Sequence, residues 1–391
     1  MKVFHQAGHQ TIWNLESFRE DNTGDGVIFS PVHFASERLE RIVEQEIKEV
    51  SLFDPQFYVP DSQKSKLHSY DFFPEKIMNG FSTNDYEAVA YEAAKLCLDF
   101  QVRNDFESII IPARYFPELI SDYVTQQKKH FVDPFLAAVE RENIDKKVFL
   151  TLPMTAMMLM DEEFKTNLLN WVTAYPEIDG VYLLVNFNEP TKQLQNFAKF
   201  KSYLEFIQGL MEAELSVICG YCNTEGIIVA VLDVYAVTIG AYENTRGFSI
   251  DKFLENDQER RGPAPRIYLP KLLNWVRWDT AEEIREDLPG LWEKIYTPTE
   301  HSEGVIASGQ RPHFSQPLLY KHHFKLLADQ YSEIRGLSMS DRITLLQEKI
   351  IEASKLYEEI EDNRVIFFDS NCKGEHLPVW NRILRHLRTA L

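Results

Sequence analysis

Two glutamates, Glu189 and Glu243, each follow an apolar run of the sequence and are the residues best placed to do chemistry. Glu189 stands in the segment from Asn186 to Pro190, and Glu243 stands between Tyr242 and Asn244. Two carboxylates that face one substrate can act as acid and base, or as acid and nucleophile, on a glycosidic-type bond. We therefore predict Glu189 and Glu243 to be a catalytic pair.

Other polar residues follow apolar runs in the same way and could bind a substrate. Arg114 and Arg246 are notable because a guanidinium offers a planar fork of donors to a carboxylate or phosphate. Asn and Asp are also favoured as helix caps, which is the competing explanation for several of these positions. The predicted substrate-binding residues are His33, Asp54, Arg114, Asn186, Asn188, Asn223, Asn244, Arg246 and Lys271.

Signatures of metal and cofactor sites are incomplete. His33 could join Asp54 and Glu243 in a divalent-metal site of the amidohydrolase kind, but the His-x-His that such sites share after the first strand is replaced by Pro31-Val32-His33-Phe34. Cys219 and Cys222 have metal-ligand spacing without a second such pair to complete a tetrahedral site. The chain has neither GxxxxGK[ST] nor a GxGxxG after a strand. We expect no metal and no cofactor.

The apolar runs themselves predict the elements that position these residues. Runs that are apolar throughout, such as Ile109 to Ile111 and Val181 to Val185, are typical of parallel strands buried on both faces. Helix-like stretches separate most of them, at 36–48, 85–100, 118–141, 162–174, 192–214 and 225–234. The predicted strands are 27–30, 51–55, 108–112, 147–152, 180–187, 215–221, 237–241 and 266–269.

Eight such strands predict a (β/α)8 barrel of the TIM type, whose strand ends form a single mouth. An open doubly wound parallel sheet is the alternative. After Trp278 the pattern becomes helical, most clearly over 341–362. We predict a barrel over 1–296 with a loop insertion at 58–83, and a helical C-terminal addition over 297–391 packed on the barrel, with 297–316 as the linker before it.

The segments around the two glutamates resemble a known family. Asn186-Phe187-Asn188-Glu189-Pro190 resembles the segment that carries the acid/base glutamate in retaining glycoside hydrolases of the barrel clan, and Tyr242-Glu243-Asn244 is similar to their nucleophile segment. Those enzymes resemble one another in placing the acid/base after the fourth strand and the nucleophile after the seventh. Here Glu189 follows the fifth predicted strand and Glu243 the seventh.

Composition limits the kinds of binding partner and the cellular compartment that we expect for this protein. The net charge is −19, with 41 basic against 60 acidic residues, which disfavours non-specific nucleic-acid binding. The four cysteines are too few and too scattered for a disulfide framework, and no apolar run reaches the length of a signal peptide or membrane span. We expect a cytoplasmic protein.

Three functions fit these observations. The leading hypothesis is an enzyme that acts on a glycosidic-type bond in a sugar or nucleoside. The second is a non-catalytic barrel subunit of a multiprotein complex, binding a protein partner through the helical C-terminal region or the 58–83 loop. The third is a barrel that binds a phosphorylated small molecule through Arg246, Lys271 and backbone amides at the mouth.

Overall fold

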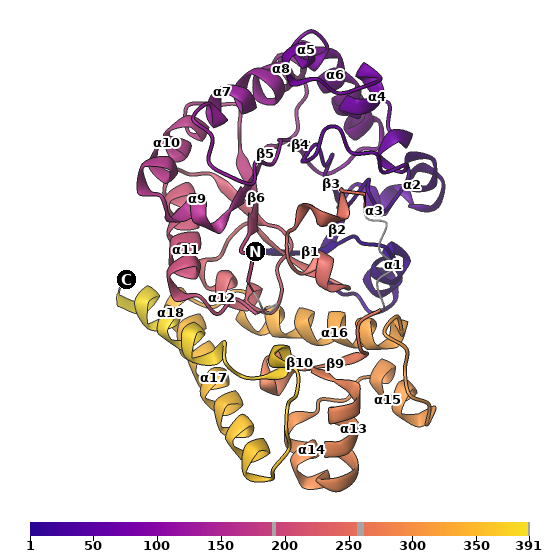
Figure 1. The fold of residues 1–391 in the computed structure, drawn as a ribbon, viewed down its shortest axis with the longest axis vertical. Coiled ribbons are helices and arrows are strands. Elements are labelled where there is room, and N and C mark those ends of the chain that lie inside the picture. Colours follow the sequence, from indigo (N-terminus) through magenta and orange to yellow (C-terminus); the bar gives the residue numbers. More distant parts are fainter. Residues whose placement is uncertain (190–192, 256–261, 390–391) are drawn as a thin grey trace.

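Eight parallel strands form a nearly closed barrel, with helices around it and a helical C-terminal region beside it (Figure 1). The structure is a computed structural model and describes residues 1–189, 193–255 and 262–389. The predicted (β/α)8 barrel is confirmed, and the open doubly wound sheet is not the fold.

The barrel strands pair in the order β3-β2-β1-β8-β7-β6-β5-β4. The first barrel strand in the chain, β1, pairs with the last, β8, over the full length of both strands. Between β3 and β4 no ladder forms among the described residues. The Glu107 N–H donates to the Ser51 carbonyl across the gap between these two strands at 2.9 Å. The strands are β1 (Lys2–Gln6), β2 (Gly26–Phe29), β3 (Leu52–Phe53), β4 (Ile109–Ile111), β5 (Val148–Thr155), β6 (Gly180–Asn186), β7 (Ser216–Cys219) and β8 (Ala236–Gly240).

One predicted strand forms but lies outside the barrel, and one barrel strand was missed. The missed strand is β1, which has a short apolar run at the very start of the chain and carries the polar His5 and Gln6. The predicted eighth strand, Arg266–Leu269, is β9 and pairs antiparallel with β10 (Asn274–Arg277). A turn through Leu273, whose φ is 52°, folds β10 back along β9, so neither strand joins the barrel. Glu189 therefore follows the sixth barrel strand and Glu243 the eighth.

Helices on the outside of the barrel connect successive strands, as the alternating pattern predicts. Three of the predicted helices are interrupted: 36–48 divides into α2 and α3, 85–100 contains a turn between α5 and α6, and 118–141 contains a π-helical turn between α7 and α8. The barrel helices are α1 (Thr11–Glu20), α2 (Ser36–Ile42), α3 (Gln45–Lys48), α4 (Pro74–Met78), α5 (Thr83–Tyr86), α6 (Ala90–Arg103), α7 (Tyr123–Gln127), α8 (Asp133–Glu142), α9 (Ala156–Met160), α10 (Glu162–Val172), α11 (Phe197–Glu212) and α12 (Gly226–Val229).

The segment 58–83, expected as a loop insertion, contains the short helix α4 and an aromatic cluster. Phe72 lies 6.0 Å from Phe53 of β3 and 5.5 Å from Phe100 of α6, measured between ring centroids. The Tyr70 hydroxyl donates to the Phe34 carbonyl at 2.5 Å. These contacts fix the segment to the barrel.

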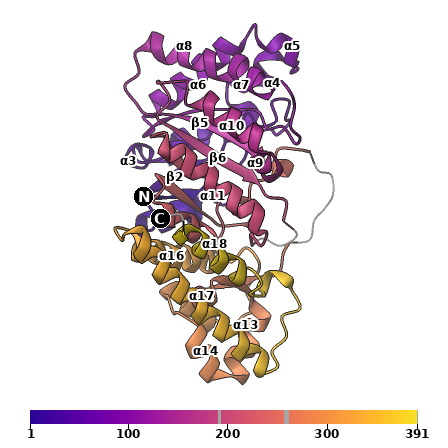
Figure 2. The ribbon, with the colours of Figure 1, turned by 90° about the vertical axis from the view of Figure 1, so that its left-hand side faces the viewer.

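The C-terminal region is a helical layer that lies along one side of the barrel (Figures 1 and 2). The segment expected as a linker holds a helix of its own, α15, which begins with a capping box between Thr299 and Ser302. The β9–β10 hairpin lies within this layer, beside α16. The helices are α13 (Trp278–Asp287), α14 (Pro289–Ile295), α15 (Glu300–Ala307), α16 (Pro317–Ile334), α17 (Met339–Asp362) and α18 (Leu377–Thr389).

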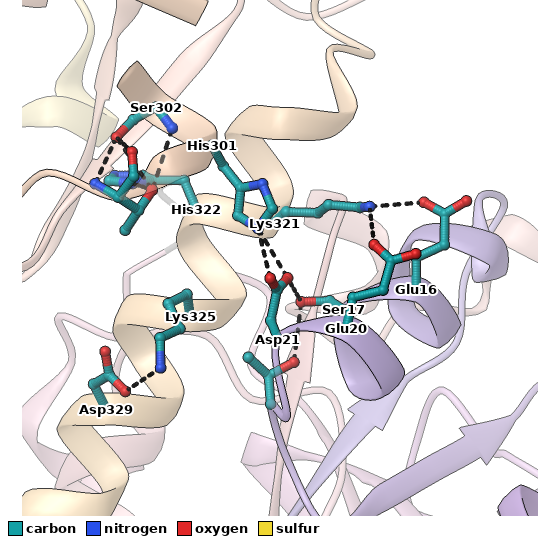
Figure 3. A network of polar contacts seen from close by, with 12 residues as sticks. Glu16, Ser17, Glu20, Asp21, His301, Ser302, Lys321, His322, Lys325 and Asp329 are labelled. Carbon is teal, nitrogen blue, oxygen red and sulfur yellow. Dashed lines mark hydrogen bonds and ion pairs between the residues drawn. The ribbon is translucent and has the colours of Figure 1, made fainter. Parts of the chain in front are cut away.

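Polar contacts with α1 attach this layer to the barrel (Figure 3). Lys321 of α16 pairs with Glu16 at 2.9 Å and with Glu20 at 3.4 Å. His301 of α15 contacts the Asp21 carboxylate at 2.9 Å. Because the buried face of α16 lies against the barrel as well, the two parts share one apolar core.

No helix in the described part of the chain combines the length and the apolar character that crossing a membrane requires.

Candidate functional site

A cavity of about 370 Å³ opens at the mouth of the barrel, between the loops that follow β6, β7 and β8. We call it the mouth cavity. It holds carboxylates, amides, a guanidinium and aromatic rings, the mixture typical of a small-molecule site. Its lining residues are Tyr115, Pro117, Val185, Asn186, Phe187, Asn188, Glu189, Leu194, Tyr203, Gly220, Tyr221, Cys222, Glu225, Val229, Arg246, Gly247, Phe248, Ser249, Ile250 and Asp251.

Glu189 forms one wall of the mouth cavity, in the loop after β6. Its Oε1 is 2.8 Å from the Lys199 Nζ, and both side chains are largely buried, at 12% and 17% exposed. Lys199 lies in the first turn of α11 and also donates to the Phe187 carbonyl at 2.7 Å. The ion pair is therefore held on its lysine side as well, which fixes the Glu189 carboxylate in place.

Glu225 is a second carboxyl of the same cavity, in the turn after β7. Its Oε1 accepts from the Asn223 N–H at 2.9 Å, while the buried Oε2 has no hydrogen-bond partner among the described residues. Burial raises the pKa of Glu225 to about 7, against the opposing effects of the Asn223 N–H and the Arg246 charge. A substantial fraction of this carboxyl is therefore protonated at neutral pH.

The turn that carries Glu225 depends on a close approach of α16. A Cβ on Gly226 would lie 2.3 Å from the Tyr331 hydroxyl of α16. Tyr221, at the start of the same turn, has a φ of 56°, and its ring packs edge-on against Phe248 at 5.5 Å between centroids. Position 226 therefore needs glycine for the helical layer to pack directly behind the mouth cavity.

Arg246 carries a buried charge at the edge of the mouth cavity. Its Nη1 donates to the Asn223 Oδ1 at 3.2 Å, and its guanidinium carbon lies 4.2 Å from the centre of the Trp275 ring. Its Nε has no hydrogen-bond partner in the part of the chain that the structure describes, and Glu243 is the carboxylate whose charge acts on it most strongly. Burial lowers the pKa of Arg246 to about 10, so the side chain stays protonated at neutral pH.

The structure does not place Glu243 in the mouth cavity. It lines a second cavity of about 310 Å³ between the barrel and the helical layer, which we call the seam cavity. Its Oε1 lies 3.9 Å from the Arg266 Nε. Glu189 and Glu243 thus line different cavities, and Glu225 is the carboxyl that shares a cavity with Glu189.

A buried polar network fills the barrel centre beside the mouth cavity. Asp54 accepts from the Tyr58 hydroxyl at 2.7 Å and from the Gln56 N–H at 3.1 Å. The Lys252 Nζ lies 3.6 Å from the centre of the Tyr221 ring. Burial raises the pKa of Asp54 and lowers the pKa of Lys252, and the attraction between their charges opposes both effects.

Aromatic rings from the loop after β8 cover this network. Phe248 and Phe253 lie 5.2 Å and 5.3 Å from Tyr58, between ring centroids. His33 is near the same centre: its Nε2 has no partner among the described residues, and burial lowers its pKa to about 3. Asp54 and His33 therefore support the floor of the mouth and do not line the mouth cavity.

The remaining predicted binding residues divide between the two cavities and other places. Asn186 lines the mouth cavity and donates to the Tyr115 hydroxyl at 3.2 Å, and Asn188 lines it at a φ of 47°. Asn244 lines the seam cavity. Arg114 lies elsewhere, where its Nη1 donates to the Thr83 hydroxyl at 2.8 Å.

Lys271 is far from its predicted place because the strand expected before it belongs to the hairpin. It pairs with Glu352 of α17 at 3.6 Å and is about half exposed. The phosphate site expected from Arg246 together with Lys271 is therefore not assembled at the mouth.

Sequence reasoning missed Glu225 and Lys199. Glu225 was included in a stretch expected to be a buried crossover helix, 225–234, because the residues after it are apolar. A single carboxyl at the start of an otherwise apolar stretch, directly after a strand, was the available signal. Lys199 gave no such signal in the sequence, because its partner, Glu189, lies ten residues earlier in a loop.

The four cysteines are free and buried, and Cys222 donates to the Cys219 carbonyl at 3.2 Å. In residues 1–189, 193–255 and 262–389, no group of three or more His, Cys, Asp or Glu side chains is arranged to hold a metal ion.

Comparisons with known proteins add little to this geometry. No protein-family model matches the chain, and a search of curated proteins finds no match. Among solved structures the chain is similar to a dihydrodipicolinate synthase from Oceanobacillus iheyensis, with 8% sequence identity and a TM-score of 0.23, over 81% of this chain and 82% of that chain. The strand pairing described above defines the barrel independently of this likeness.

Proposed function

We propose that this barrel is an enzyme that cleaves a glycosidic-type bond of a small sugar or nucleoside, with Glu189 and Glu225 as its two carboxyl groups. The observation that carries the proposal is that both line the mouth cavity but differ in environment. Glu189 is ion-paired with Lys199, whereas Glu225 is buried with an unpartnered oxygen. A buried carboxyl of raised pKa that shares a cavity with an ion-paired carboxylate is the arrangement that acid-assisted bond cleavage uses.

In this reaction Glu225 is the general acid. It gives its proton to the leaving oxygen or nitrogen as the bond to the sugar carbon breaks. The Glu189 carboxylate stabilises the positive charge that develops on the sugar. Water then adds to the sugar carbon, and the proton it releases returns to Glu225, so the enzyme is unchanged.

The walls of the mouth cavity suit a ring-shaped substrate. Tyr115 and Tyr221 both pack against Phe248, at 5.7 Å and 5.5 Å between ring centroids, and present aromatic surface to the cavity. Asn186 and Asn188 add amide groups able to hydrogen-bond hydroxyls. A volume of about 370 Å³ is at the lower end of the range for small-molecule sites, which favours one sugar or one nucleoside.

The test compares Glu225→Gln and Glu189→Gln with the wild type on a panel of nucleosides and 4-nitrophenyl glycosides, scoring free base or nitrophenol. We expect kcat to fall by about 10²- to 10⁴-fold in Glu225→Gln. The wild-type rate should decrease above pH 7 as Glu225 loses its proton, and this decrease should be absent from the residual activity of the variant.

Glu283→Gln is the matched control, because Glu283 is exposed on α13, a helix of the C-terminal layer (Figure 1), and does not line the mouth cavity. It should retain wild-type turnover. A full rate in Glu225→Gln would overturn the proposal. So would a loss confined to Glu243→Gln, which would restore the pair expected from the sequence.

A further inference from the structure

The seam cavity is a second concave site, separate from the mouth cavity. It lies where the loop after β8 meets the β9–β10 hairpin and α16, and it has a volume of about 310 Å³. The described lining residues are His9, Tyr242, Glu243, Asn244, Arg246, Pro263, Ala264, Arg266, Trp275, Phe314 and Tyr320. Nothing in the proposed reaction uses this cavity.

Aromatic rings make up much of its wall. Tyr320 lies 5.1 Å from Tyr242 and 6.1 Å from Trp275, between ring centroids. The Tyr320 hydroxyl donates to the Phe314 carbonyl at 2.6 Å, which fixes the ring in the wall. Rings held in this way favour a flat apolar ligand that can stack on or edge against them.

The same wall carries two arginines. Arg246 is 7% exposed and, among the described residues, has a single neutral hydrogen-bond acceptor and no paired carboxylate. Arg266 pairs with Asp369, and its buried Nε lies 3.9 Å from the Glu243 Oε1 and makes no hydrogen bond in the described part of the chain. The charges of Glu243 and Glu225 act on Arg246 without a hydrogen bond to it among the described residues. A buried guanidinium with an unpartnered N–H is well placed to bind an anion from outside the chain.

The side from which that anion approaches follows from the surrounding charges. Arg246 lines both cavities, but the mouth cavity also carries Glu189, Glu225 and Asp251. Of the described lining residues of the seam cavity, Glu243 is the one carboxylate, against Arg246 and Arg266. An anion is therefore better accommodated on the seam side.

We propose that the seam cavity is a binding site for a small aromatic anion, whose ring lies against Trp275 and Tyr320 and whose carboxylate or phosphate pairs with Arg246 and Arg266. The guanidinium groups suit both anionic groups, because each presents oxygen acceptors to the fork of N–H donors. The site requires no catalysis at the mouth.

Isothermal titration of the full chain tests the proposal with matched probes. Indole-3-acetate supplies a flat ring with a carboxylate, indole-3-ethanol the same ring without charge, and phenyl phosphate a ring with a phosphate. We expect one molecule of an anionic probe to bind per chain, at least about tenfold more tightly than indole-3-ethanol. Whichever anionic probe binds identifies the class of anionic group.

Variants assign the binding to this cavity. Arg266→Gln and Tyr320→Leu should each lower the affinity for the anionic probe by about tenfold or more. Tyr320→Phe, which keeps the ring, should bind the probe as tightly as the wild type does. Arg311→Gln, at a 62% exposed side chain paired with Asp279, is the charge control and should change nothing. Unfolding curves in urea establish that each variant is folded.

Three results would overturn the proposal: failure of both anionic probes to bind at millimolar concentration, equal binding of indole-3-ethanol, or unchanged affinity in Arg266→Gln and Tyr320→Leu. None of these results would bear on cleavage at the mouth cavity. Conversely, a full rate in Glu225→Gln, which would overturn the proposed catalysis, leaves the binding test unaffected.

Discussion

Replacing Glu225 by Gln should change how the stability of the protein depends on pH. The carboxyl has a pKa of about 7 in the folded chain, above its usual value of 4.5, because it is buried. The folded state therefore holds this proton more tightly than the unfolded state does. The free energy of unfolding contributed by the group is greatest at low pH and is lost as pH rises from 4.5 through 7.

The magnitude follows from the two pKa values. A difference of one in pKa is worth about 1.4 kcal/mol, so between pH 4.5 and 7.5 the wild type should lose about 3 kcal/mol through Glu225. Glutamine is neutral at every pH and can still accept from the Asn223 N–H. Relative to the wild type, Glu225→Gln should therefore gain about 3 kcal/mol over that interval.

Urea unfolding followed by tryptophan fluorescence, repeated from pH 4.5 to 8, measures this difference. Because both proteins share every other ionisable group, the difference between their curves isolates Glu225. Glu283→Gln, at an exposed position of α13, is the control for replacing a glutamate by glutamine. A flat difference for Glu225→Gln, or one of opposite slope, would refute the reasoning and remove the physical basis for Glu225 as the acid.

Three further predictions concern the fold around the two cavities. Gly240→Ala should destabilise the protein by about 1–3 kcal/mol, measured by urea unfolding, because its Cβ would lie 2.3 Å from the Thr245 carbonyl oxygen in the turn that leads to Arg246. His322 is buried with a pKa of about 4, below its usual 6.5, so stability should fall by up to about 3 kcal/mol as pH drops from 6.5 to 4. His322→Gln should make that decline shallower in the same unfolding series, and an unchanged slope would contradict the lowered pKa. Trp380→Ala should cost about 3–5 kcal/mol in the same assay, since its buried ring also donates to the Leu194 carbonyl at 3.1 Å; a cost under 1 kcal/mol would show that α18 does not hold that loop.

The barrel was predictable because parallel strands buried on both faces leave a local signal. Seven of the eight strands, from β2 to β8, are short apolar runs followed by polar residues, and each was recognised from that pattern. β1 lacked the signal, since it ends in His5 and Gln6, both fully buried inside the fold. The Arg266–Leu269 run carried the signal without being in the barrel, because pairing is decided by a partner strand and not by the run itself.

The candidate site was predicted only in its location. Strand ends predicted Asn186, Asn188, Glu189 and Arg246 at one mouth, and the structure places these four around the mouth cavity. The partner of Glu189 could not be read in the same way. Glu243 and Glu225 each follow a strand, and which of them lines the same cavity as Glu189 depends on how the loops after β7 and β8 fold over the barrel.

The sequence by itself determined the class of fold, the end of the barrel where polar groups gather and the helical character of the C-terminal region, because each depends on periodicity and on residues close together in the chain. Tertiary structure alone decided which carboxyls share a cavity, which charges are buried, and that the hairpin and α16 close a second cavity against the barrel. Those properties arise from contacts between segments far apart in sequence, as between Arg246 and Trp275. The raised pKa of Glu225 has the same origin, since burial by the whole fold removes the water that would stabilise its charge.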